Sequence, residues 1–363
     1  MVSLLSPDPA RLTKALKRRA EELGFVSVGV ARAEPLAPEG AWLRAFVAEG
    51  RHGQMEWLAE TAEVRADPRH PGMVPRARSV LVVAAPYARP NDPARMGPSP
   101  GRVARYAWGR DYHNVLRRQL RKLERMLREA GHEARYSVDA RPVFERAWAQ
   151  RAGVGFVGKN CCLIVPGVGS HVFLGTVVTT AELEPDEPMA PRCGRCTLCL
   201  DACPTGAFLG PHRLDARRCV SYLTIEHEGA IAPELEAQMG DWVFGCDACQ
   251  DVCPYNRTER PPAPDSDPYA PSAPLELSAE ALLAMGDETY RERFEGSPLR
   301  RAGATRLARN VVIALGNSGD RRHLPVLEEA RHHRAPVVRE AAERALRRLD
   351  AGEPARTGDA DDR

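Results

Sequence analysis

Ten cysteines constrain this 363-residue chain more than any other feature, because eight of them lie at regular spacings within one stretch. The stretch runs from Cys193 to Pro254, begins RCGRCTLCLDACPTGAF and ends FGCDACQDVCPYN. Each end carries a run of closely spaced cysteines that finishes in Cys-Pro. Cysteine thiolates are the usual ligands of iron–sulfur clusters, and two sets of four predict two [4Fe–4S] clusters.

The first run has the spacing C-x2-C-x2-C-x3-C-P of bacterial two-cluster ferredoxins, in which the fourth cysteine ligates the other cluster. The second run lacks one cysteine, and Cys219 supplies it. Two residues between ligands let consecutive thiolates wrap one face of a cube, and the longer step before proline turns the chain away. We therefore expect one cluster on Cys193, Cys196, Cys199 and Cys253, and the other on Cys203, Cys219, Cys246 and Cys249.

A pair of zinc sites is the main alternative, because C-x2-C pairs also bind zinc. A cysteine run ending in Cys-Pro, present twice, is not a zinc pattern and disfavours that alternative. Disulfides are disfavoured as well, because clustered cysteines in a chain without a secretory signal usually bind metal. Residues 1–23 lack the apolar segment of a signal peptide, and no apolar run approaches the ~20 residues that span a bilayer. We therefore expect a soluble, cytoplasmic protein that acts without a membrane.

The residues before the cysteine stretch alternate between helical and strand patterns. Such alternation favours an α/β domain with one mixed sheet, which we place at residues 1–182. The expected helices cover residues 9–24, 42–49, 112–130 and 142–152, and the expected strands cover residues 25–31, 79–85, 133–138 and 171–180.

The rest of the chain divides by composition into four further parts. The last helices resemble a HEAT-type helix pair, but one pair with a flanking helix is too few for an independent solenoid, so they must pack on the rest. The parts are a ferredoxin-like two-cluster module at 183–258, a Pro-rich linker at 259–274, a HEAT-like helical region at 275–350 with helices at 301–315, 323–331 and 336–349, and a disordered tail at 351–363.

A second group of polar residues lies in YSVDARPVFERAWAQRAGVGFVGKN, residues 136–160. Asp139 directly follows a predicted strand, where open α/β sheets place ligands. It can equally be an N-cap for the next helix. Gly153, Gly155 and Gly158 match G-x-G-x-x-G, but no strand precedes them, so a dinucleotide site is disfavoured. Lys159 beside them can be an ordinary surface lysine.

Taken together, VDARPVFERA, GVGFVGKNCCLIVPGVGS, the cysteine module and the helical tail resemble epoxyqueuosine reductases, which are cobalamin-dependent iron–sulfur enzymes that modify tRNA. The resemblance covers about residues 8 to 350. The cysteine module alone is shared with ferredoxins and reductive dehalogenases. The segment around Asp139 and the tail distinguish the families. Trp148, Phe156 and the pair Cys161 and Cys162 depart from the usual family pattern, and Cys161 and Cys162 have no assigned role.

The resemblance implies reduction of epoxyqueuosine to queuosine at the wobble position of tRNA, the last step of queuosine biosynthesis. It implies a cobalamin fed by the two clusters, an external low-potential electron donor and Asp139 as the catalytic acid. An acid role requires a pKa raised from about 3.9, as burial beside a flat cofactor produces. The implied cobalamin contacts are Arg65, Asp139, Lys159, Leu163, Leu174 and Asp247.

Two arginine-rich segments are candidates for binding tRNA phosphates. Arg300, Arg301, Arg306 and Arg309 recur at near-helical spacing in the tail, and we expect the tRNA face there. Arg117, Arg118, Arg121 and Arg125 form a similar stripe on the long helix. Either segment can instead be a solvated helix face. The net charge of +2 fits a localised basic patch and not a general nucleic-acid binder. We also expect a monomer.

Three other functions compete with this interpretation. A reductive dehalogenase has the same cofactors, but many carry an export signal that this chain lacks. A ferredoxin-type electron carrier would bind no cobalamin. A tRNA-binding chaperone with structural clusters would be redox-inactive.

Overall fold

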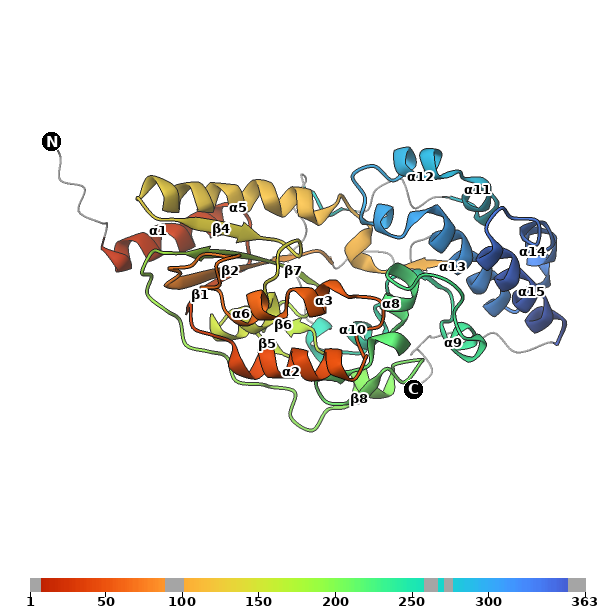
Figure 1. Ribbon diagram of the computed structural model, residues 1–363, viewed down its shortest axis with the longest axis horizontal. Coiled ribbons are helices and arrows are strands. Elements are labelled where there is room, and N and C mark those ends of the chain that lie inside the picture. The colour runs from red at the N-terminus through yellow and green to blue at the C-terminus, as the bar shows by residue number, and fades with distance from the viewer. Residues whose placement is uncertain (1–7, 89–100, 258–266, 271–276, 352–363) are drawn as a thin grey trace.

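The computed structural model describes residues 8–88, 101–257, 267–270 and 277–351. Figure 1 shows a sheet-containing part at one end of an elongated molecule and the C-terminal helices at the other, with the cysteine module between them. Most of the expected linker and all but one residue of the expected tail lie outside the described residues.

The N-terminal part is built on a four-stranded sheet in the order β1-β2-β7-β4. Its strands are β1 (Ser27–Arg32), β2 (Ser79–Pro86), β7 (Val172–Thr179) and β4 (Ala134–Ser137). All three neighbouring pairs are antiparallel, so the prediction of a mixed sheet is wrong. The helix α5 (Tyr112–Glu129) connects β2 to β4, and both strands run the same way. However, β7 enters between them antiparallel to both, which no local sequence pattern reveals.

Helices cover both faces of this sheet, which explains why β2 is apolar along its whole length. On one face lie α1 (Pro9–Glu22) and α5, which buries Leu116, Leu120, Leu123 and Leu127 at helical spacing. The other face packs against α6 (Glu145–Arg151). The predicted positions of these strands and long helices are confirmed to within a few residues.

Smaller elements complete this part. Here α2 (Ala37–Ala48) is longer than expected, and the expected loop after it contains α3 (Trp57–Glu60) and α4 (Ala62–Ala66). The glycine-rich segment forms a hairpin of β5 (Phe156–Val157) and β6 (Leu163–Ile164). A Cβ on Gly155 would lie 2.5 Å from the carbonyl oxygen of Ile164, so glycine is required by the hairpin partner. The dinucleotide-site alternative therefore finds no support in this geometry.

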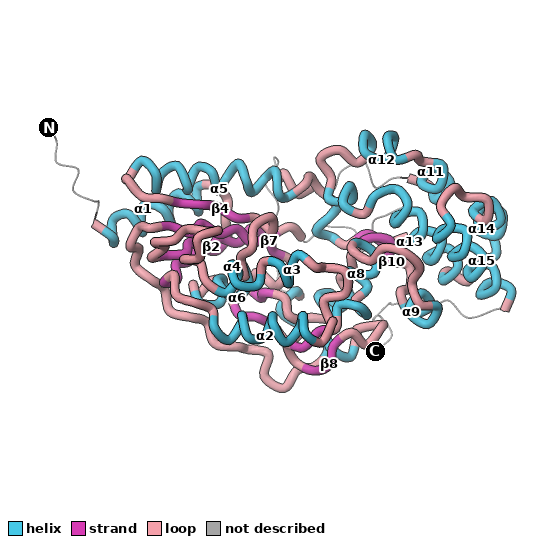
Figure 2. Tube along the Cα trace, in the orientation of Figure 1, coloured by secondary structure: helices cyan, strands magenta, loops and turns pink. Residues whose placement is uncertain are grey.

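The cysteine module consists of short elements joined by turns, as Figure 2 shows. Strands of two or three residues carry no recognisable periodicity, so the sequence does not predict them. The elements are α7 (Leu198–Asp201), β8 (Phe208–Gly210), β9 (Arg213–Leu214), α8 (Val220–Ile225), α9 (Pro233–Gln238), β10 (Trp242–Phe244) and α10 (Ala248–Asp251). The strand β10 pairs in parallel with β3 (Arg102–Val103), which connects the module to the N-terminal part.

The C-terminal helices share one hydrophobic core with the module and with α2. This core runs from Leu43 through Phe244 to Leu349, which confirms that the tail packs on the rest. The central helix is α13 (Gly303–Asn317), which packs chiefly on α15 (Pro336–Asp350). The other helices are α11 (Ala279–Ala284), α12 (Asp287–Arg293) and α14 (Leu324–Ala330).

A buried ion pair network holds α15 to the module. Glu236 of α9 is fully buried and accepts hydrogen bonds from Arg344 at 2.7 and 2.9 Å and from Arg348 at 3.3 Å. Its backbone oxygen accepts from the Asn317 amide at 2.8 Å. A buried carboxylate is tolerated only with such partners, so this contact fixes the docking of the tail.

No helix in the described ranges is long and apolar enough to cross a membrane.

Replacing Glu236 by Ala is expected to destabilise the protein by about 3–5 kcal/mol, because two arginines are left without their buried partner. Urea unfolding followed by circular dichroism measures this. The control Glu340→Ala removes an exposed carboxylate 4.0 Å from the same Arg344 and is expected to cost less than about 0.5 kcal/mol. Equal losses of unfolding free energy in both variants would show that the buried ion pair contributes no more to stability than the exposed carboxylate.

Candidate functional site

Asp139 lies two residues beyond the end of β4, in a strained backbone conformation. Its φ is 47°, a left-handed value that is uncommon for residues other than glycine. Its side chain is 63% exposed. The N-cap position of α6 is Phe144, and no side chain caps that helix in the described structure. The N-cap alternative for Asp139 is therefore wrong, and the strained turn presents a carboxylate at the sheet edge.

Two residues at the start of α5 face this carboxylate. The Tyr112 hydroxyl donates to Asp139 Oδ2 at 2.7 Å, and His113 Nε2 lies 4.0 Å from the same oxygen. The Tyr112 ring stacks on Phe173 of β7 at 4.5 Å between centroids. Burial raises the pKa of Tyr112, and the charge of Asp139 adds to this, so the phenol keeps its proton and donates it in the hydrogen bond.

Glu145, the first residue of α6, holds the Asp139 turn from the other side. Its Oε1 accepts the backbone N–H of Asp139 at 3.2 Å and the Ser137 hydroxyl at 3.3 Å. Burial raises the pKa of Glu145 to about 7, the nearby Asp139 adds to the rise, and Arg65 and Arg146 oppose it. At neutral pH this carboxyl is therefore present in both protonation states.

Arg65 approaches the same group from α4. Its Nε donates to Thr61 Oγ1 at 2.9 Å, and its Nη1 donates to the Val143 carbonyl at 3.2 Å. The guanidinium lies 5.1 Å from the centre of the Trp57 ring. Burial lowers the pKa of Arg65, while the charges of Glu145 and Asp139 raise it. The structure thus brings the predicted residue Arg65 beside Asp139.

An apolar surface of the sheet adjoins these groups. Val172 and Leu174 of β7 are only half-buried, and they share a face with Thr176 because side chains alternate along a strand. The Thr176 hydroxyl is buried and has no hydrogen-bond partner among the described residues. A half-open apolar face with an unsatisfied hydroxyl fits a large flat ligand that carries amide groups at its edge.

Three other predicted cofactor contacts are engaged within the protein. The Lys159 ammonium donates to the carbonyls of Gly194 and Cys196, both at 2.8 Å, so it stabilises the first cysteine loop. Leu163 is 3% exposed and belongs to the core below the sheet. Asp247 is buried and accepts the backbone N–H of Arg105 at 2.7 Å.

Asp247 is a buried carboxyl next to Cys246 of the second cysteine run. Burial raises the pKa of Asp247 to about 7, Asp251 adds to the rise, and Arg105 lowers it. Arg105 also pairs with Asp251. The contacts of Arg105 with Asp247 and Asp251 join the segment that follows β3 to the second cysteine run.

The four cysteines that the spacing groups into the first cluster line one small pocket of about 50 Å³. Phe156 and Ile164 of the β5–β6 hairpin pack against Cys253 in its wall. The pocket is lined by Lys159, Asn160, Ile164, Cys193, Cys196, Leu198, Cys199, Cys253, Pro254 and Tyr255. Cys253 therefore lies with cysteines that are far away in sequence, as cross-ligation requires.

The other four cysteines are also neighbours. Burial raises the pKa of Cys219, and the nearby Cys203 adds to this. Burial likewise raises the pKa of Cys246, with Cys219 and Cys203 adding to it. Cys249 lies beside Cys246 and Cys219. The second predicted ligand set thus converges too.

A ninth cysteine accompanies this second group. Cys162 is hydrogen-bonded to Cys249, and that bond lowers the pKa of Cys162 more than burial raises it. The adjacent Asn160 amide donates to the Cys249 carbonyl at 3.2 Å, which fixes the turn against the module. Cys161 has a left-handed φ of 65°. Spacing alone does not reveal this contact, because Cys162 lies outside both cysteine runs.

The arginines predicted to bind tRNA in the tail are largely engaged within the protein. Arg309 is fully buried, so its prediction as a tRNA contact is wrong. Its guanidinium donates to the carbonyls of Leu223, His227 and Gly229, which close a loop of the module. A tertiary role of this kind cannot be told from a surface role by helical spacing.

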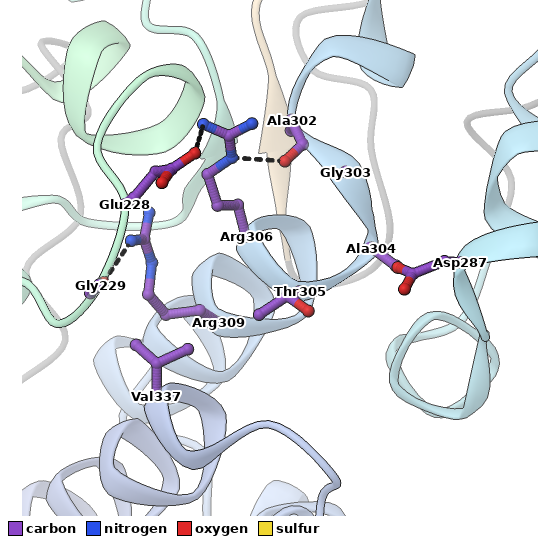
Figure 3. Close-up of a pocket in the computed structure, with 10 residues that line it drawn as sticks. All are labelled: Glu228, Gly229, Asp287, Ala302, Gly303, Ala304, Thr305, Arg306, Arg309 and Val337. Carbon is purple, nitrogen blue, oxygen red and sulfur yellow. Dashed lines mark hydrogen bonds and ion pairs between the residues drawn. The ribbon is translucent and has the colours of Figure 1, made fainter. Parts of the chain in front are cut away.

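Figure 3 shows Arg306 and Arg309 beside a pocket of about 310 Å³ between the module and α13. Arg306 donates to the Ala302 carbonyl at 2.6 Å and lies 3.7 Å from Glu228. Arg301 pairs with Glu226 at 2.7 Å. Of the four predicted tail arginines, only Arg300 is exposed without such a contact in the described structure.

Two family models match parts of this chain, and similar proteins match most of it. Residues 192–256 match the family model described as "4Fe-4S double cluster binding domain", and residues 65–140 match "Epoxyqueuosine reductase QueG, DUF1730". An epoxyqueuosine reductase of Pseudomonas aeruginosa is 43% identical, over 95% of this chain and 97% of its own length. One of Xanthomonas campestris is 42% identical, over 93% and 96%.

Solved structures show the same likeness. A crystal structure of epoxyqueuosine reductase with an epoxyqueuosine-modified tRNA stem loop has a TM-score of 0.84 and 32% identity, over 93% of this chain and 90% of that chain. A Bacillus subtilis epoxyqueuosine reductase with its catalytic loop swung out of the active site has a TM-score of 0.82 and 31% identity, over the same shares.

Replacing Cys253 by Ala is expected to lower bound iron from about eight to about four atoms per chain, because a [4Fe–4S] cluster that normally has four cysteine ligands loses one. Iron analysis and electron paramagnetic resonance of the reduced protein measure this. Cys161→Ala is the control, because Cys161 belongs to neither group, and it is expected to keep all iron. Full iron in Cys253→Ala would contradict the grouping around the 50 Å³ pocket.

Proposed function

The chain belongs to the epoxyqueuosine reductase family and is an oxidoreductase, and we propose that it reduces the epoxide of epoxyqueuosine at the wobble position of tRNA to the alkene of queuosine. Relatives of that name span nearly the whole chain and support the substrate. The observation that carries the proposal is the carboxylate of Asp139. It is presented by a strained backbone turn, accepts a hydrogen bond from Tyr112 at 2.7 Å and lies beside a half-open apolar face.

Converting an epoxide to an alkene and water requires two electrons and two protons. Two [4Fe–4S] clusters, whose binding the double-cluster family match supports, would supply these electrons one at a time from an external low-potential donor. The proposed ligands are the two cysteine groups described above. Cross-ligation by Cys203 and Cys253 would hold both clusters in one unit.

Cobalamin is the proposed cofactor at the apolar face. The half-buried Leu174 would contact the flat ring, and the Arg65 guanidinium would contact polar groups at its edge. When bound, cobalamin supplies a strongly reducing, nucleophilic cobalt. Lys159 and Leu163 are not included, because Lys159 stabilises the first cysteine loop and Leu163 lies in the core.

Asp139 is the proposed general acid for the leaving epoxide oxygen. The Tyr112 hydroxyl orients its carboxyl, and Glu145 holds its backbone N–H at 3.2 Å. A substrate and cofactor that cover Asp139 would exclude bulk water, so that the leaving oxygen is the group to which its carboxyl passes a proton. Glu145, with a pKa of about 7, is the proposed source of the proton that recharges Asp139.

A turnover assay distinguishes this function from the electron-carrier and chaperone alternatives, because neither of those would convert epoxyqueuosine. Anaerobic incubation with epoxyqueuosine-containing tRNA, a chemical reductant and cobalamin is expected to remove one oxygen atom from the nucleoside, as mass spectrometry detects. Asp139→Asn is expected to lower the rate by about 10²–10⁴-fold because it cannot donate the proton. Asp350→Asn is the control at an exposed aspartate. No conversion by wild-type protein with both clusters and cobalamin bound would overturn the function.

Turnover is expected to fall as pH rises through about 7, because Glu145 loses its proton there. Below that pH the protonated form predominates and can recharge Asp139. In Glu145→Gln the amide oxygen still accepts the hydrogen bonds of Asp139 and Ser137, so the turn is kept while the proton is lost. This variant is expected to turn over more slowly and without the step near pH 7.

The measurement is kcat under saturating tRNA across one pH unit on each side of neutrality. Glu328→Gln, an exposed change in α14, is expected to keep the wild-type profile. An unchanged step near pH 7 in Glu145→Gln would assign that step to another group.

A further inference from the structure

Among the described residues, α5 carries a concentration of exposed basic side chains and begins beside Asp139. Tyr112, the first residue of α5, hydrogen-bonds to Asp139. The helix then extends about 27 Å away from the site at 1.5 Å per residue. Its buried side packs on the sheet through four leucines, and its other side faces solvent. Figure 1 shows it along one edge of the N-terminal part, next to β4.

The solvent side of α5 carries six exposed cations and one exposed acid, Glu129. Glu124 is half-buried and pairs with Arg128 at 3.1 Å. The exposed cations are Arg117, Arg118, Arg121, Lys122, Arg125 and Arg128. Within the described ranges, Arg118, Lys122 and Arg125 make no ion pair or side-chain hydrogen bond. This concentration of charge differs from the chain as a whole, whose net charge is only +2.

Two arginines near one aromatic ring connect this helix face to the turn of Asp139. The guanidinium of Arg121 lies 6.0 Å from the centre of the Tyr136 ring, and that of Arg141 lies 6.0 Å from the same ring. Tyr136 is on β4, the edge strand of the sheet, and Arg141 is exposed two residues after Asp139. The basic surface is therefore continuous from the carboxylate to the middle of α5.

We propose that this surface, formed by the exposed cations of α5 with Tyr136 and Arg141, binds the phosphate backbone of the tRNA whose anticodon nucleotide enters the site at Asp139. The proposal rests on the function proposed above. Arginine forks pair bidentately with phosphate, and each phosphate that is neutralised releases counterions. A row of guanidiniums leading away from the carboxylate can thus hold the strand that flanks the reacting nucleotide.

Two features favour α5 over the alternatives. The tail arginines that were expected to bind tRNA are engaged, since Arg309 is buried and Arg301 pairs with Glu226. An acidic electron-donor protein is the other polyanion to consider. Electrons enter at the clusters, and the β5–β6 hairpin beside the first cysteine pocket packs with α6, on the opposite face of the sheet from α5.

The test compares two triple variants that remove the same charge. Arg118→Ala, Arg121→Ala and Arg125→Ala together change α5, and alanine keeps its helical propensity. Arg322→Ala, Arg331→Ala and Arg347→Ala together change exposed positions of the C-terminal region as a control. A third protein carries lysine at the three α5 positions and so keeps the charge. Fluorescence anisotropy with labelled tRNA, over a series of salt concentrations, measures binding to the cluster-loaded proteins.

The α5 alanine variant is expected to bind tRNA at least about tenfold more weakly at 0.15 M salt, with a salt slope reduced by about 2, because three phosphate contacts are lost. The lysine variant is expected to regain most of the affinity, and the control is expected to stay within about twofold of wild type. Turnover by the alanine variant is expected to show a raised KM with little change in kcat.

Unchanged affinity and salt slope in the α5 alanine variant would overturn the proposal, as would an equal loss in the control variant. A slower reduction of the clusters by an acidic donor protein, with tRNA binding intact, would assign the surface to the donor and also overturn it. If the wild-type protein fails to convert epoxyqueuosine, the proposed function fails while the binding result stands separately. If it converts epoxyqueuosine and the α5 variant matches it, only this inference fails.

Discussion

The return of Cys253 to the pocket of Cys193, Cys196 and Cys199 is the constraint on which the rest of the structure depends. To bring Cys253 into this pocket, the chain must fold back on itself between residues 193 and 253. The β5–β6 hairpin forms part of the pocket wall, and Lys159 and Asn160 bind backbone carbonyls of both cysteine runs. The pocket therefore positions the N-terminal part as well as the module. The sheet edge with Asp139 belongs to the same N-terminal part, so a single set of contacts relates the sheet to the cysteine groups.

The parts of this arrangement that were predictable are those with a local physical signal. The cysteine spacings reflect the size of a metal cluster, and the leucines of α5 repeat with the helical period. The position of Asp139 after a strand was also visible. By contrast, the insertion of β7 between β2 and β4 depends on pairing across the whole domain. The burial of Arg309 depends on carbonyls about 80 residues away, and a guanidinium gives the same sequence pattern in either environment.

The Asp139 turn combines backbone strain with restraint by neighbouring side chains. Asp139 has a left-handed backbone, and three side chains, Tyr112, His113 and Glu145, surround it from two helices. A strained residue persists only while its surroundings hold it. Here the restraint includes a carboxyl whose pKa lies near neutrality, so the contact is sensitive to protonation. The related Bacillus subtilis structure has its catalytic loop out of the active site.

The shared core of the C-terminal helices and the module has a consequence for the second cysteine group. Cys219 and Cys246 pack at the border of this core, which also contains α13 and α15. The buried carboxylate of Glu236 pairs with Arg344 and fastens α15 to the module. A change that loosens this ion pair would therefore alter the packing beside both thiols, although Glu236 contacts neither of them. The surroundings of the second cysteine group thus depend on helices that contribute no cysteine.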